Sequence, residues 1–228
     1  DLPTWDLRMT SDESVFMEYL SGDREWGPEV VFIPDSKRFK QETVKELIWG
    51  YGKKYGGVVS SGGFLKNNAY EYYENFPFFG FWRVNNSPNI ENEMGHENMK
   101  IVNKHHPVTF RSSDFIRYAG DNYPIYEFYF LKPSTGAKAT SKVENLAYWP
   151  GSEGVDPDQD WLAMSARWES TIEENFFNRT MFINGHLAQS AAEGKGTEEW
   201  IKLARRSIYW TSSSKMSFKP IKLYLWKG

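Results

Sequence analysis

The stretch Tyr123-Pro-Ile-Tyr-Glu-Phe-Tyr-Phe-Leu-Lys132 is the most strand-like run in the 228-residue chain. Its aromatic and β-branched side chains fit a pleated surface, and Pro124 and Pro133 stand near its ends, where a missing N–H does least harm. Because side chains alternate along a strand, both faces of this run are mostly apolar, and Glu127 is the polar exception. We therefore predict a central strand that is covered on both sides.

Shorter apolar runs on either side of this stretch predict more strands and a few helices. The strands are expected at 4–9, 29–33, 58–59, 78–84, 100–102, 107–110 and 142–149. One helix is expected over 13–20, because Ser11-Asp12-Glu13 supplies caps, and another ends near Tyr51, where apolar residues recur at helical spacing. A short helix is expected through 115–118.

The C-terminal part shows a different pattern, which begins after the loop at 150–156. Asp156-Pro157 is typical of a helix start, and the following apolar residues step by three or four: Trp161, Met164, Trp168, Ile172 and Phe176. Two more helices are predicted over 181–192 and 198–206, and the segments 207–210 and 216–226 are predicted to form a terminal hairpin. We expect one α+β domain over 1–228, with a mostly antiparallel sheet packed against a C-terminal group of helices and closed by a β-hairpin.

The composition excludes several kinds of site. The chain has no cysteine, which removes disulfides, thiol nucleophiles and Cys-ligated zinc, and no metal or cofactor is expected. A net charge of −3 makes nucleic acid an unexpected partner, and no apolar run reaches the roughly 18 residues of a membrane span. The first residue is Asp1, so we expect a processed or excised chain. The lack of cysteine favours an intracellular, organellar or virion location over secretion.

Acidic and histidine side chains provide the candidate catalytic residues. An inward-facing Glu127 on an apolar strand would have a raised pKa and could act as a general acid, with Glu71, Glu74 or Glu144 as a second carboxyl group. The alternative is that Glu127 is exposed or paired with a basic residue. His105 and His106, with His96 nearby, are the densest group of side chains that titrate near neutral pH. Adjacent histidines on a strand would point to opposite faces.

Aromatic residues provide the candidate binding surface. The last predicted strand places Lys222, Tyr224 and Trp226 on one face, a combination typical of platforms that stack flat ligands, and Trp82 lies in another predicted strand. The same face would equally suit a protein neighbour or solvent.

Two functions therefore remain open. The first is a non-catalytic structural or interaction protein, a subunit of a larger assembly of self or other protein chains. Its basis is the 17% aromatic content, with ten Trp, and exposed aromatic residues would form its interfaces. The alternative is a carbohydrate-active hydrolase, or a carbohydrate-binding module, with an acid–base carboxylate in an aromatic-lined cleft.

Overall fold

A mixed sheet of nine strands organises the part of the chain that the structure describes. The computed structural model describes residues 5–22, 28–33, 39–51, 57–61, 81–83, 98–117, 131–133, 141–149, 161–171, 176–183, 198–212 and 221–226. Across the sheet the order is β1 (Trp5–Thr10), β11 (Ile221–Trp226), β2 (Val30–Ile33), β3 (Gly57–Ser61), β10 (Phe176–Ile183), β9 (Trp161–Thr171), β8 (Ser141–Trp149), β5 (Asn98–Ile101) and β6 (Phe115–Arg117).

The sheet is half parallel and half antiparallel. The four neighbouring pairs from β1 to β10 are parallel, and the four pairs from β10 to β6 are antiparallel. The prediction of a mostly antiparallel sheet is therefore wrong. The reason is that β11 and β10, which come late in the chain, lie beside β2 and β3 from its first quarter, and such long-range pairings leave no mark in local sequence.

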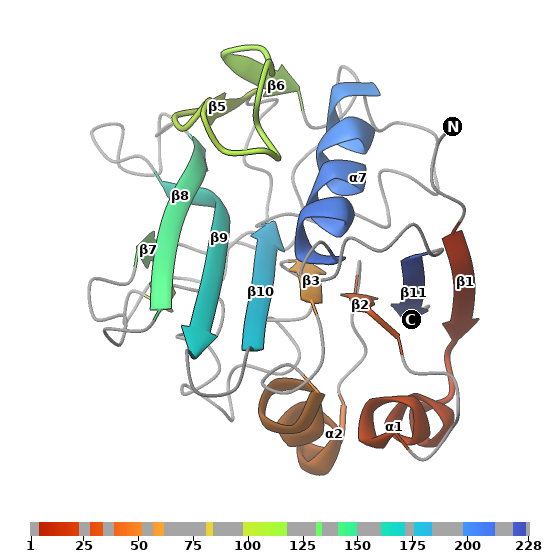
Figure 1. Cartoon of the computed structure of the whole chain (residues 1–228). Helices are drawn as coiled ribbons and strands as arrows, with labels where there is room; N and C mark the ends of the chain where they lie inside the picture. The colour runs from red at the N-terminus through yellow and green to blue at the C-terminus, as the bar shows by residue number, and fades with distance from the viewer. Residues whose placement is uncertain are drawn as a thin grey trace.

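Helices cover both faces of the sheet (Figure 1). Helix α7 (Glu198–Ser212) packs on one face, while α1 (Glu13–Ser21), α2 (Gln41–Lys45) and its π-helical continuation η1 (Glu46–Tyr51) pack on the other. Strand β2 shows the alternation directly, because Val30 joins the core on the α7 side and Val31 joins the opposite core. The predicted α+β class is confirmed, and none of the described helices is long and apolar enough to cross a membrane.

The N-terminal predictions agree with the structure. Helix α1 begins where the caps were expected, and the side chain of Asp12 accepts hydrogen bonds from the N–H groups of Ser14 and Val15 at 2.9 and 3.4 Å. The helical spacing before Tyr51 is also confirmed, since Val44, Leu47 and Tyr51 are buried together. The predicted strands at 4–9, 29–33, 58–59 and 142–149 correspond to β1, β2, β3 and β8.

The long helix predicted from Trp161 is wrong, because residues 161–171 form strand β9. Residues 162–167 are all buried. Leu162 lies in the core on the α1 side and Met164 in the core on the α7 side, because the pairing with β8 shifts register between these two residues. A strand buried on both faces carries apolar residues at odd and even positions, so steps of three and four arise without a helix. The next predicted helix is wrong at its start, since Met181 to Ile183 belong to β10.

Three smaller predictions also need correction. Residues 207–210 lie inside α7, and β11 pairs in parallel with β1 and β2, so there is no terminal hairpin between these segments. Of the predicted group of helices, α7 is the one within the described residues. Residues 107–110 form turns, while 115–117 form strand β6 where a helix was expected. The helix expected at 198–206 is confirmed and continues to Ser212.

The stretch predicted as the central strand is described only at its end. Residues 123–130, including Glu127, lie outside the described residues. Strand β7 (Leu131–Pro133) pairs with β4 (Phe81–Arg83) in a separate two-stranded sheet. At this end, therefore, the stretch does not belong to the nine-stranded sheet.

Candidate functional site

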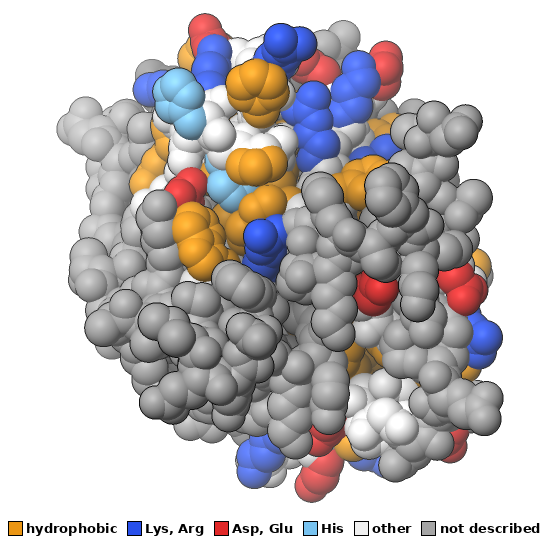
Figure 2. All heavy atoms as spheres, viewed as in Figure 1, with side chains coloured by type: hydrophobic (Ala, Val, Ile, Leu, Met, Phe, Trp, Pro, Cys, Tyr) orange, Lys and Arg blue, Asp and Glu red, His pale blue; other side chains and the backbone are white. Residues whose placement is uncertain are grey.

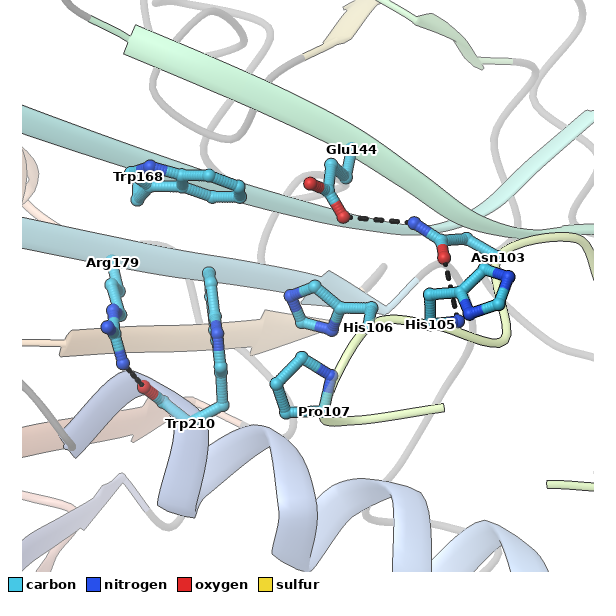
Figure 3. Close-up of a pocket in the computed structure, with 8 residues that line it drawn as sticks. All are labelled: Asn103, His105, His106, Pro107, Glu144, Trp168, Arg179 and Trp210. Atoms are coloured by element: carbon cyan, nitrogen blue, oxygen red, sulfur yellow. Dashed lines mark hydrogen bonds between the residues drawn. The ribbon is translucent and has the colours of Figure 1, made fainter. Parts of the chain in front are cut away.

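A pocket of about 430 Å³ opens on the α7 side of the sheet. Its lining comes from β8, β9, β10, the C-terminal half of α7 and the segment that follows β5, and it consists of Asn103, His105, His106, Pro107, Glu144, Trp168, Arg179 and Trp210. Figure 2 shows histidine, acidic, basic and hydrophobic side chains gathered on one part of this face. Figure 3 shows the individual lining residues.

The strand register explains why three of these side chains meet. Arg179 on β10 lies directly opposite Trp168 on β9, and Glu144 on β8 lies opposite Ala166 on β9. Residues opposite one another, and residues two apart on one strand, share a face of the sheet. Ala166 belongs to the core on the α7 side, so Trp168, Arg179 and Glu144 also project toward α7.

The segment after β5 is held in place by hydrogen bonds of its own. The N–H groups of Val102 and Asn103 both donate to the carbonyl of Leu146 on β8, at 3.0 and 3.3 Å. The N–H of Thr109 donates to the carbonyl of His106 at 3.0 Å, and Arg206 of α7 donates to the carbonyl of Phe110 at 2.9 Å. These contacts tie the pocket wall to both β8 and α7.

His106 is buried in this wall, with 4% of its surface exposed. Its Nδ1 accepts a hydrogen bond from the N–H of Val108 at 3.3 Å. Burial lowers its pKa from 6.5 to about 4, while the nearby Glu144 carboxylate acts to raise this pKa and Arg179 lowers it further. The imidazole is therefore neutral near pH 7.

Trp210 lies between the Arg179 guanidinium and the His106 imidazole (Figure 3). The Arg179 guanidinium lies 5.2 Å from the centre of the Trp210 ring and donates a hydrogen bond to the Trp210 carbonyl at 2.8 Å. The His106 ring approaches Trp210 edge-on, with 4.8 Å between ring centres and an interplanar angle of 61°. The Trp168 ring also approaches Trp210 edge-on, with 6.2 Å between the ring centres. Burial also lowers the pKa of Arg179.

Glu144 supplies the carboxylate of the pocket. Its Oε2 accepts a hydrogen bond from the side-chain amide of Asn103 at 2.9 Å, and the Asn103 Oδ1 in turn accepts one from the N–H of His105 at 3.0 Å. Glu144 therefore presents carboxylate acceptor oxygens among the residues that line the pocket. No three His, Asp or Glu side chains in the described part of the chain are grouped so as to hold a metal ion.

The structure brings together only some of the residues expected from the sequence. His105 lines the pocket, as does Glu144, which was considered a second carboxyl group. His105 and His106 both line this pocket, and they lie in a bend after β5, so the opposite faces expected for adjacent histidines on a strand do not apply. Glu127, His96, Glu71 and Glu74 lie outside the described residues.

The predicted aromatic platform lies on two strands whose side chains are outside the described part of the structure. Trp82 belongs to β4, and Lys222, Tyr224 and Trp226 belong to β11, which lies between β1 and β2. The sequence reasoning missed Asn103, Trp168, Arg179 and Trp210 as site residues. Trp168 was noted in the sequence as one of the apolar residues of the predicted helix, and this assignment to a helix concealed the Arg179 beside it.

Comparisons with known proteins give little further information. No protein-family model matches the chain, and no curated protein matches it. Among solved structures it is similar to the cytoplasmic protein STM3548 from Salmonella typhimurium, with 10% sequence identity and a TM-score of 0.45. That similarity covers 89% of this chain and 75% of the other, and at this TM-score it supports no conclusion about function.

Proposed function

We propose that the pocket binds a small, uncharged carbohydrate. The observation that carries this proposal is the half-buried indole of Trp168 in one pocket with a carboxylate, a guanidinium and a neutral imidazole. Ligand sites combine apolar and aromatic walls with a few polar groups that fix orientation. A sugar ring matches such a lining, because its C–H groups form an apolar face and its hydroxyls both donate and accept hydrogen bonds.

The charges of the lining favour a neutral ligand. Glu144 and Arg179 carry opposite charges, and His106 is uncharged near pH 7. A net anion would meet the carboxylate of Glu144, and a net cation would meet the guanidinium of Arg179. Hydroxyl groups avoid both conflicts, since each can donate to the carboxylate and accept from a nitrogen donor.

Trp168→Ala tests this proposal. We expect D-glucose, D-galactose, D-mannose, D-xylose or N-acetyl-D-glucosamine to bind the wild-type chain in a calorimetric titration, and the substitution to weaken that binding at least tenfold, about 1.4 kcal/mol. Phe110→Ala is the matched control, because Phe110 is half exposed, aromatic and absent from the pocket lining. Equal affinities for the two variants, or no binding by any of the five sugars, would contradict the proposal.

Hydrolysis is a separate question about the same site. Glycoside hydrolysis uses a second carboxyl group across the scissile bond, in addition to one such as Glu144. A reducing-sugar assay with disaccharides of the sugar that binds would reveal this activity, and Glu144→Gln should then abolish it.

A second function, a subunit that assembles with copies of itself, is favoured by the edge of the sheet at β1. In the described part of the chain β1 pairs on one side with β11 and ends the sheet on the other. Leu7 and Met9 are 46% and 57% exposed there, and the intervening Arg8 is exposed as well. Exposed edge strands are templates for pairing with another strand.

The sequence of β1 is complementary to itself when two copies of the strand pair antiparallel. In an antiparallel pair with its two-fold axis at Leu7, Asp6 of each copy lies opposite Arg8 of the other copy, and the two Leu7 side chains face each other. The proposed dimer therefore combines opposite charges on one face of the joined sheet with apolar contact on the other face.

Light scattering during size-exclusion chromatography tests the assembly. At micromolar concentration we expect a mass of twice 26.6 kDa, and Leu7→Lys should reduce it to the mass of one chain, because two lysines would then be directly opposed. Ile201→Lys is the control, since Ile201 is an equally exposed apolar residue on α7. A wild-type chain that elutes with the mass of one copy would rule out this interface.

A further inference from the structure

The side chain of His106 has one hydrogen-bonding atom that the protein leaves unpaired. Nδ1 accepts from the Val108 N–H, so in the neutral ring the proton resides on Nε2. This Nε2 is buried and has no hydrogen-bond partner in the protein. Buried polar atoms are rarely left in this state, and each instance calls for an explanation.

The surroundings of His106 show where a partner for this atom would lie. The imidazole extends toward Trp210 and approaches that ring edge-on, with 4.8 Å between the ring centres (Figure 3). An aromatic face is a weak acceptor in comparison with an oxygen atom. The ring also lines the pocket, so an oxygen of a bound molecule can reach the Nε2–H from the pocket side.

Glu144 lines the same pocket and acts electrostatically on the His106 ring. The Glu144 carboxylate and Arg179 are the charged groups that act on the His106 ring, and Figure 3 shows Glu144 and His106 on opposite sides of the pocket. One wall therefore offers an N–H donor and the other offers acceptor oxygens. Two neighbouring hydroxyls can satisfy both walls, because one can accept from the N–H while the other donates to the carboxylate.

We propose that His106 is a specificity-determining residue whose Nε2–H donates to a hydroxyl oxygen of the ligand, while Glu144 accepts from the adjacent hydroxyl of the same ligand. The inference rests on the proposed carbohydrate function and makes it more specific. The pocket then selects two adjacent hydroxyls, a 1,2-diol. A carboxylate or ketone would accept from His106 but has no proton to donate to Glu144.

Two substitutions of His106 separate this role from a structural one. His106→Asn keeps an acceptor at the position of Nδ1, and so preserves the bond from the Val108 N–H, but removes the donor at Nε2. His106→Gln places an amide N–H₂ near the position of Nε2 and removes the acceptor for Val108. A purely structural residue would tolerate Asn better, whereas a ligand-contacting residue would tolerate Gln better. Lys104→Gln, at an exposed neighbour that does not line the pocket, is the control.

The probes are the sugar that binds best among the five above, 1,2-cyclohexanediol and cyclohexanol. With the sugar and the diol we expect His106→Asn to bind about tenfold more weakly than the wild type, as for one lost hydrogen bond, and His106→Gln to bind within about threefold. Cyclohexanol should bind more weakly than the diol to the wild-type chain. ¹⁵N spectra of the imidazole should show a protonated Nε2 whose signal shifts when the diol is added.

Each result has a distinct meaning. If the sugar binds and His106→Asn leaves its affinity unchanged, the role of His106 is wrong while the carbohydrate proposal stands. If the five sugars fail to bind but the diol binds in a His106-dependent way, the carbohydrate proposal is wrong while the role of His106 stands. If neither sugar nor diol binds, or if the proton resides on Nδ1, the inference is overturned.

Discussion

Replacing Gly57 with alanine is expected to lower the free energy of unfolding by about 3 kcal/mol, because a Cβ at this position would overlap the backbone of α7. An ideal Cβ would lie 2.5 Å from the Cβ and from the carbonyl oxygen of Thr211, and 2.7 Å from its carbonyl carbon. Thr211 is buried, and its hydroxyl donates to the carbonyls of Ser207 and Ile208. The helix cannot yield locally, so it must move away from β3.

That movement would reach the pocket, because Trp210 is the neighbour of Thr211 on the same helix. Urea unfolding followed by tryptophan fluorescence would give the change in free energy. Gly22→Ala is the control: Gly22 ends α1 at a φ of +81° with no atom within 4 Å of the added Cβ. Gly22→Ala should lower the free energy of unfolding by about 1 kcal/mol, because alanine is strained in the left-handed backbone conformation. A Gly57→Ala chain as stable as the Gly22→Ala chain would show that α7 packs on β3 less closely than described.

Acidification is expected to remove about 3 kcal/mol of stability through His106 alone. The pKa of this imidazole is about 4 in the folded chain, against 6.5 when unperturbed. Between these two values the unfolded chain binds a proton that the folded chain does not, so stability falls as the pH drops from about 6.5 to 4. Above that window His106 contributes no pH dependence, and below it the loss is complete.

The comparison of wild type with His106→Asn isolates this contribution from the carboxyl groups that titrate in the same range. Asn does not titrate, and the variant keeps Glu144 and Arg179, the charged groups that act on this position. Between pH 6.5 and 4 the wild type should therefore lose about 3 kcal/mol more stability than the variant. Urea unfolding at half-unit pH steps measures the difference. Parallel curves for the two chains would mean that His106 is not held neutral by burial.

Local sequence patterns were a good guide wherever an element is defined by its own residues. Asp12 marked the start of α1, and the apolar spacing up to Tyr51 marked the helical segment on the same side of the sheet. They were a poor guide for β9, since burial on both faces erased the alternation by which a strand is recognised. The mixed character of the sheet was inaccessible for a related reason, because parallel neighbours such as β3 and β10 are separated by more than 100 residues.

The candidate site shows the same division. The sequence by itself determined that this chain is an α+β protein without cysteine chemistry, and it singled out His105 and Glu144 as groups capable of polar chemistry. Only the tertiary structure decided that Trp168, Arg179 and Trp210 join them, because strand register and the docking of α7 bring residues from three distant segments to one pocket. The neutral state of His106 was likewise decided by burial, a property of the packed chain that no neighbouring residue in the sequence specifies.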